Sequence, residues 1–155
     1  MDKKLIFGID FDGTAVSHEF PKVGNDIGAV PVLKRLVEEG HQLILFTMRS
    51  DAKATSKEAR SEEYPDVAPR NFLSDAVQWF KDNNIPLYGI QENPTQKKWT
   101  SSPKPYCHIY IDDAALGCPL TYNEEISDRL FVDWVAVEKY LVSMNVLKYL
   151  GDNDS

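Results

Sequence analysis

Hydrophobic residues alternate along the chain between short continuous runs and stretches in which they recur every three or four positions. Continuous apolar runs are typical of parallel strands, because both faces of such strands are covered by other parts of the protein. These runs predict four strands, at 5–9, 43–46, 87–90 and 108–111. A shorter run, Leu130-Phe131-Val132, predicts a fifth strand.

Helical spacing of apolar residues fills the intervals between the strands. It predicts one helix over 27–39 with Pro31 in its first turn, and a second helix over 72–80 with Asn71 as its N-cap. A last helix is expected to begin after Asp133. The order β-α-β-α-β, followed by further strands, predicts an α/β fold, a three-layer sandwich around a parallel Rossmann-like sheet.

The length and composition suit one domain with its own hydrophobic core. The chain has 155 residues, of which 43% are hydrophobic and 26% are charged. We therefore expect a single domain over 1–150 and a frayed tail over 151–155. A polar stretch at 51–70 has the length of a lid-like loop and is too short for a folded cap domain, and residues 91–106, with three prolines, are irregular as well.

Charge and hydropathy limit the classes of partner and the cellular location that we expect for this protein. A net charge of −7 makes nucleic acid an unfavourable partner, because phosphate backbones are bound by clusters of Lys and Arg. No apolar run approaches the ~18–20 residues of a membrane span, and the N-terminal apolar stretch is too short for a signal peptide. Two cysteines are too few for a disulfide framework. We therefore expect a cytoplasmic protein with no membrane segment.

Acidic residues follow two of the expected parallel strands. Asp10 and Asp12 come directly after the first strand, and Asp112 and Asp113 come after the fourth. In open parallel sheets, ligands bind at the carboxyl ends of the strands. Four carboxylates at one edge would repel one another unless a cation joined them, and a few hard oxygen ligands suit Mg²⁺. The sequence therefore predicts a magnesium site at this edge.

The segments around these strand ends resemble the haloacid dehalogenase superfamily of phosphotransferases. FGIDFDGT resembles the first signature of that superfamily, an apolar strand followed by Asp-x-Asp-Gly-Thr. LILFTMRS resembles the second signature, and IYIDDAALG resembles the fourth, an apolar strand that ends in paired acids. The third signature is a single Lys upstream of the fourth. The resemblance covers roughly residues 5–117, and it implies a Mg²⁺-dependent phosphatase of the small type without a cap domain.

The resemblance implies a role for each acid. Asp10 would attack the phosphorus and form an aspartyl-phosphate. Asp12 would protonate the leaving oxygen and then deprotonate the hydrolytic water, and Gly13 would let the backbone turn so that the Asp12 carboxylate reaches the reacting centre. Mg²⁺ would be held by the Asp10 carboxylate, the backbone carbonyl of Asp12, and Asp112. Asp113 would be either a ligand through water or an orienting group.

Two further residues are matched to the phosphoryl group. The Thr47 hydroxyl would donate a hydrogen bond to a phosphoryl oxygen, the alternative being an N-cap for the segment that follows. Arg49 would bind a second anionic group of the substrate, the alternative being a surface salt bridge.

The lysine of the third signature has three candidates, which are Lys104, Lys97 and Lys98. Its task would be to offset the negative charge between nucleophile and phosphoryl group. Lys104 is favoured because it lies eight residues before Asp112, a spacing like that of short members of the superfamily. Eight extended residues span about 26 Å, so Lys104 reaches the site only if the strand at 108–111 is short and the chain bends around Pro105.

The absence of a cap suggests an open site, which suits a phosphorylated macromolecule. A small phosphomonoester is also compatible, as is closure by the second subunit of a homo-oligomer. Two other functions share this type of fold. A signalling receiver domain carries its phosphorylated Asp after the third strand, where this chain has Gln91-Glu92-Asn93. A non-catalytic binding module would keep the fold without turnover, although Asp10 and Asp12 are both present.

Overall fold

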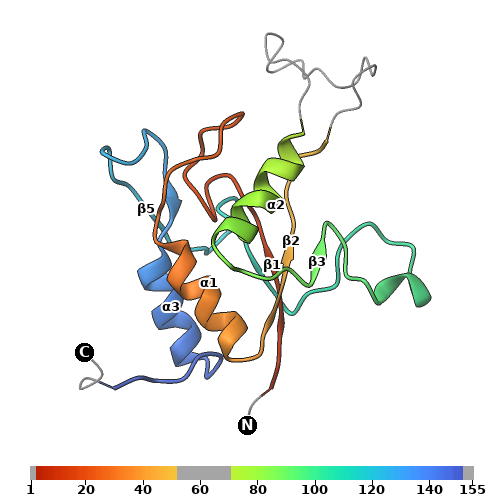
Figure 1. Cartoon of the computed structure of the whole chain (residues 1–155). Helices are drawn as coiled ribbons and strands as arrows, with labels where there is room; N and C mark the ends of the chain where they lie inside the picture. The colour runs from red at the N-terminus through yellow and green to blue at the C-terminus, as the bar shows by residue number, and fades with distance from the viewer. Residues whose placement is uncertain (1–2, 52–70, 152–155) are drawn as a thin grey trace.

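The computed structural model describes residues 3–51 and 71–151. Its centre is a four-stranded parallel sheet in the order β3-β2-β1-β4. The strands are β1 (Ile6–Ile9), β2 (Gln42–Leu45), β3 (Gly89–Ile90) and β4 (Ile109–Ile111). β1 lies between β2 and β4, so that Ile9 is opposite both Leu45 and Ile111. The expected α/β fold with a parallel sheet is confirmed, and helices flank the sheet (Figure 1).

Three helices pack against one face of the sheet. They are α1 (Ala29–Glu38), α2 (Phe72–Asp82) and α3 (Trp134–Ser143). The core contains buried residues of all three helices together with Phe7, Ile9, Leu43 and Leu45. Because successive side chains of a strand point to opposite faces, these four residues mark the helical side of the sheet. Pro31 lies in the first turn of α1, as expected.

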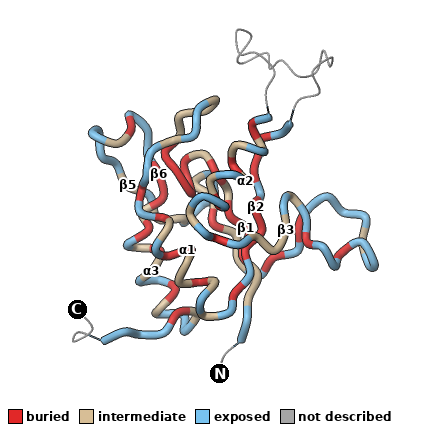
Figure 2. The backbone as a smooth tube through the Cα atoms, viewed as in Figure 1, coloured by how far each residue is buried: buried red, intermediate tan, exposed pale blue. Residues whose placement is uncertain are grey.

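The opposite face is covered by the irregular segment 91–108, in which the helical part is the 3₁₀ turn η2 (Gln96–Lys98). The segment is joined to the sheet by the Tyr110 hydroxyl, which donates to the Pro105 carbonyl at 2.6 Å. Gly8 leaves room for the Tyr110 ring, because a Cβ at position 8 would lie 2.8 Å from Cδ1 of that ring. Figure 2 shows this segment as largely exposed, in contrast to the buried strands and inner faces of the helices.

The start of α2 differs from the sequence prediction. The Asn71 side chain makes no capping hydrogen bond. The Asp51 carboxylate instead accepts from the backbone N–H of Ser74 at 2.9 Å and from its hydroxyl at 2.6 Å. A bridge between Asp51 and Asn71 brings this carboxylate to the helix N-terminus, where a negative charge is favourable.

The predicted fifth strand is present but belongs to a different sheet. It forms β6 (Phe131–Val132), which pairs antiparallel with β5 (Leu120–Thr121). The Val132 N–H donates to the Gly13 carbonyl at 3.0 Å, so this small sheet is attached to the loop that follows β1.

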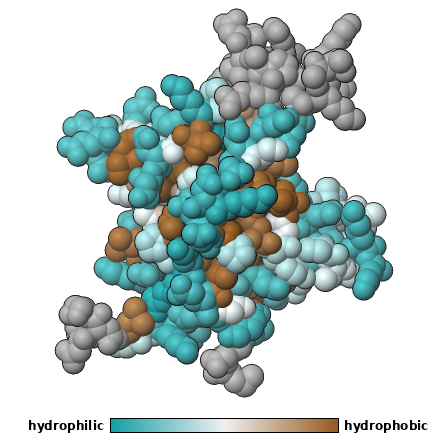
Figure 3. Space-filling model, in the orientation of Figure 1, coloured by the Kyte–Doolittle hydropathy of each residue, from teal (hydrophilic) through white to brown (hydrophobic). Residues whose placement is uncertain are grey.

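Within 3–51 and 71–151, no helix has the length and apolar character that a membrane crossing requires. The same residues contain no cap domain. Apart from Asp51 and Gly151, the expected lid-like loop at 51–70 and the expected tail at 151–155 lie outside the described residues. The face drawn in Figure 3 is mainly hydrophilic, with apolar side chains in separate groups.

Candidate functional site

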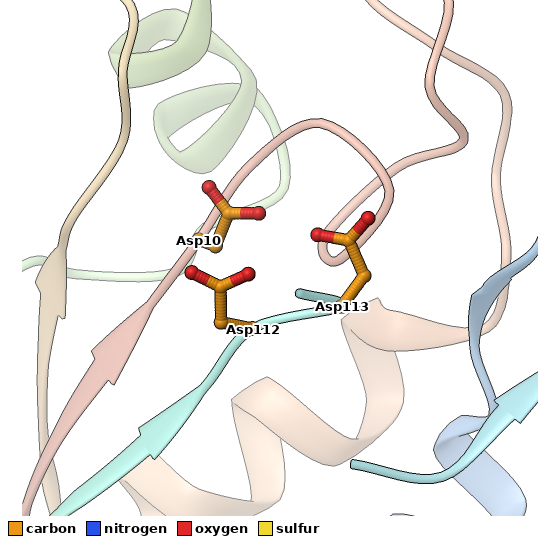
Figure 4. A group of neighbouring side chains, drawn as sticks. All are labelled: Asp10, Asp112 and Asp113. Atoms are coloured by element: carbon orange, nitrogen blue, oxygen red, sulfur yellow. The ribbon is translucent and has the colours of Figure 1, made fainter. Parts of the chain in front are cut away.

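Three carboxylates meet where β1 and β4 end. Asp10 follows β1, and Asp112 and Asp113 follow β4. One oxygen from each lies within 4.8 Å of the others, and Figure 4 shows the three carboxyl groups gathered at this edge. The pairing of the two strands explains the convergence, because the Asp10 N–H donates to the Ile111 carbonyl at 3.1 Å. Three of the four acids predicted from the sequence are therefore brought together.

The buried hydroxyl of Thr14 connects this cluster. It lies 2.9 Å from Oδ2 of Asp10 and 3.2 Å from Oδ1 of Asp113, and it accepts the Asp113 N–H at 3.0 Å. A hydroxyl has one proton, so it donates to one of the two carboxylates at a time. The indole N–H of Trp134 donates to the Thr14 carbonyl at 2.7 Å and ties the loop to α3. Sequence reasoning assigned Thr14 only to a motif and Trp134 only to a helix.

Gly13 is required by both the backbone and the cluster. Its φ of +83° lies in the left-handed region that favours glycine. A Cβ at this position would also collide with the Asp113 carboxylate. The Phe11 carbonyl accepts the N–H groups of Ala15 at 2.8 Å and Thr14 at 3.1 Å, which closes the turn. The sharp turn predicted after the first strand is therefore present.

The cluster is electrostatically unfavourable without a cation. Burial and the neighbouring charge of Asp112 raise the pKa of Asp10 from 3.8 to about 8. Burial also raises the pKa of Asp112. A bound divalent cation would reverse this repulsion, and a set of carboxylate oxygens without nitrogen or sulfur suits a hard ion such as Mg²⁺. The three residues thus fit a site for a hard divalent cation.

The Asp12 side chain lies outside the cluster because it is bound by Arg49. Oδ2 of Asp12 accepts from Nε of Arg49 at 2.8 Å, and Oδ1 accepts from Nη2 at 2.7 Å. Arg49 is only 3% exposed. The alternative of a salt bridge is therefore present, with Asp12 as the partner, but its side chains are 1% and 13% exposed and it does not lie on the open surface. The expected contact of Arg49 with a substrate anion and the expected contact of the Asp12 backbone carbonyl with the metal both stay predictions.

Gln91 holds the loop after β2. Its side-chain carbonyl accepts the Thr47 N–H at 2.9 Å, and its amide donates to the carbonyls of Thr47 at 2.6 Å and Arg49 at 3.2 Å. The Thr47 hydroxyl accepts the Arg49 N–H at 3.1 Å, which leaves the proton of that hydroxyl for a different acceptor. Sequence reasoning used Gln91 only to argue against a receiver domain. A polar residue at a third parallel strand end was the available signal.

Lys104 lines a pocket of about 260 Å³ that also contains Asp10, Asp112, Phe46 and Tyr110. Its Nζ lies 5.2 Å from the centre of the Tyr110 ring. The two conditions for its reach are met, because β4 has three residues and the chain folds back at the Pro105 carbonyl bound by Tyr110.

The other two lysine candidates lie elsewhere. Lys97 and Lys98 are exposed on η2, and Nζ of Lys97 is 3.5 Å from a Glu92 carboxylate oxygen. Neither of these two residues lines the pocket.

The sequence matches no protein-family model and no curated protein sequence. A solved structure does match, that of a conserved protein from Bacteroides thetaiotaomicron, at 24% identity and a TM-score of 0.62. The match covers 92% of this chain and 93% of that one. The two proteins share a fold.

Proposed function

We propose that this protein is a Mg²⁺-dependent phosphatase of the haloacid dehalogenase type, which hydrolyses phosphomonoesters through an aspartyl-phosphate. The observation that carries the proposal is the convergence of Asp10, Asp112 and Asp113 within 4.8 Å beside a pocket that contains Lys104. A nucleophilic carboxylate, further oxygen ligands for a cation and a lysine are the parts that phosphoryl transfer by this route requires.

Asp10 and Asp112 would hold the metal, with Asp113 as a further ligand or an orienting group. The bound ion supplies positive charge that offsets the charge of the phosphoryl oxygens. An oxygen of Asp10 would attack the phosphorus while the bond to the leaving oxygen breaks. Lys104 and the Thr47 hydroxyl would bind phosphoryl oxygens during this step.

Asp12 would supply the proton transfers. In the first step its carboxyl proton would pass to the leaving oxygen, which departs as an alcohol. In the second step the Asp12 carboxylate would take a proton from the attacking water, and the cleavage of the aspartyl-phosphate would release inorganic phosphate and regenerate Asp10. Proton transfer of this kind typically contributes ~10²–10⁴-fold to the rate.

The substrate is a phosphorylated molecule, and a site without a cap domain leaves room for it to approach. Both a phosphorylated macromolecule and a small phosphomonoester satisfy this condition, and a second copy of the chain could complete the enclosure. Gln91 supports hydrolysis over a receiver function, since its side chain is engaged with the backbone of Thr47 and Arg49 where a receiver would carry its phosphorylated Asp.

The first test is phosphate release from a broad panel of phosphate esters. We expect activity with Mg²⁺, loss in EDTA, and recovery with Mg²⁺ or Mn²⁺ but not with Ca²⁺, whose larger and looser shell disturbs the in-line geometry. Full activity after exhaustive chelation would refute the metal dependence. A stable phosphoprotein formed only with a kinase would favour the receiver, and Mg²⁺ binding without turnover would favour the binding module.

The second test separates the two carboxylates by intact-protein mass after acid quench. Asp10→Asn should form no phosphoenzyme, whereas Asp12→Asn should accumulate it with an activated ester whose leaving group needs no proton. Asp128→Asn, a change of an exposed aspartate outside the cluster, serves as the control and should behave as wild type. A phosphorylated Asp10→Asn protein would disprove the assignment of the nucleophile.

A further inference from the structure

The Arg49 guanidinium binds the Asp12 carboxylate through two hydrogen bonds. Nε and Nη2 each contact a different oxygen, at 2.8 and 2.7 Å. Two parallel bonds between a planar fork and a carboxylate set the orientation of that carboxylate as well as its position. The side chains are 1% and 13% exposed, so water competes weakly for this contact.

Arg49 is itself held from several sides. Its Nη1 donates to the Phe72 carbonyl at 3.2 Å, at the start of α2, and its Nη2 donates to the Lys22 carbonyl at 2.8 Å. The guanidinium carbon lies 4.9 Å from the centre of the Phe11 ring and 5.2 Å from that of Phe20, distances at which cation–π attraction operates. The guanidinium is therefore a fixed support rather than a mobile surface charge.

These contacts decide between two roles for Arg49. A guanidinium has five N–H donors, and four of those of Arg49 are directed at Asp12 and at two backbone carbonyls. Bidentate binding of a substrate anion by Arg49 would require breaking contacts that are already made inside the protein. Support of Asp12 leaves all of these contacts in place.

We propose that Arg49 is a positioning residue, which fixes the Asp12 carboxylate for proton transfer at the phosphoryl site. This inference rests on the proposed function, since it assigns Arg49 a task through Asp12. Asp12 follows the strand on a tight turn, and its side chain would have other orientations without a partner. A misplacement of about 1 Å can cost about 10²-fold in rate.

The test is a double-mutant cycle on phosphatase turnover. Four proteins are compared with 4-nitrophenyl phosphate and Mg²⁺: wild type, Arg49→Met, Asp12→Asn and the double variant. Arg49→Met alone should lower kcat by about 10²-fold with KM nearly unchanged. In the Asp12→Asn background the same change should lower kcat by less than about 3-fold, because residues that act through one another are not additive.

Two further variants separate positioning from general destabilisation. Arg49→Lys keeps the charge and one donor toward Asp12, so it should recover part of the lost kcat, and it replaces Arg49→Met in the cycle if that variant does not fold. Arg35→Met removes a different arginine ion pair, with Glu39 at 3.0 Å and Glu138 at 3.4 Å. It should lower the melting temperature and leave kcat unchanged.

The results of the double-mutant cycle decide whether Arg49 positions Asp12 or binds the substrate. Equal losses of kcat in both backgrounds, or a rise in KM with unchanged kcat, would overturn the inference and return Arg49 to the role of a substrate ligand. Wild-type turnover together with such additive losses would leave the proposed phosphatase function intact. A complete lack of wild-type turnover across the ester panel would overturn the proposed function and this inference with it.

Discussion

Replacing Asp10 with Asn should stabilise the metal-free protein, and increasingly so as the pH rises. Burial and the charge of Asp112 raise the pKa of Asp10 from 3.8 to about 8. A carboxyl group with a raised pKa binds its proton more tightly in the folded state than in the unfolded state. Its favourable contribution to folding is therefore complete below about pH 4 and is lost as the pH rises toward 8.

The size of the effect follows from the two pKa values. Each pH unit between them costs about 1.4 kcal/mol, so the loss between pH 5 and pH 8 is on the order of 4 kcal/mol. Asn cannot ionise and lacks this dependence. The free energy of unfolding of Asp10→Asn should therefore exceed that of wild type by about 4 kcal/mol more at pH 8 than at pH 5.

The assay is urea unfolding in EDTA at several pH values from 5 to 8.5, with Asp128→Asn as the control. Added Mg²⁺ should stabilise wild type most at high pH, where the ligands are ionised, and should stabilise Asp10→Asn much less. Parallel curves of unfolding free energy against pH for wild type and Asp10→Asn would show that Asp10 is not a desolvated, repelled carboxylate. The electrostatic argument for a metal site would then lose its main support.

Three further predictions concern residues around the cluster. Lys104→Met should lower turnover by several orders of magnitude while Lys97→Met and Lys98→Met stay near wild type; a damaging Lys97/Lys98 double change would instead place the lysine on η2. Gly13→Ala should lower the melting temperature and weaken Mg²⁺ binding measured by calorimetry, because its Cβ meets the Asp113 carboxylate. Gln91→Glu should cost about 1–3 kcal/mol in urea unfolding, because its carboxylate would face two carbonyls, and unchanged stability would contradict this arrangement.

That the acids share one edge of the sheet could be predicted, because the carboxyl ends of parallel strands lie at the same edge whatever the order of the strands. Continuous apolar runs placed the strands, and residues that follow adjacent parallel strands must share an edge. Ile9 lies opposite Ile111 in the register, so Asp10 and Asp112 become neighbours. The spacing to Asp112 favoured Lys104, whereas its place beside Asp10 and Asp112 in the pocket depends on a short β4 and a bend near Pro105 that the sequence left as conditions.

Contacts that depend on the direction of side chains could not be predicted from the sequence. Asp12 and Arg49 are 37 positions apart, and their pairing depends on how two loops turn after leaving the sheet. The cap of α2 by Asp51 depends on the two ends of a long connection meeting, which no local pattern near Asn71 indicates. The pairing of β6 with β5 could not be predicted either, because apolar runs predict where strands lie but not which strands pair.

The polar residues at the four strand ends form a connected series across the edge of the sheet. Gln91, after β3, binds the backbone of the loop after β2. Arg49 in that loop binds Asp12 in the loop after β1, and Thr14 in the latter loop binds Asp113 after β4. Each connection joins neighbours in the order β3-β2-β1-β4.

For the proposed phosphatase, this arrangement would have a consequence for catalysis. Each loop is held by the next before any substrate arrives, so the charged groups do not need to be ordered during the reaction, and preorganised groups of this kind stabilise a transition state most effectively. The series also separates two kinds of carboxylate. Asp10, Asp112 and Asp113 lie within 4.8 Å of one another, which favours a bound cation, whereas the Asp12 carboxylate is paired with Arg49 and lies outside this cluster. In the proposed mechanism, this separation would leave Asp12 for proton transfer.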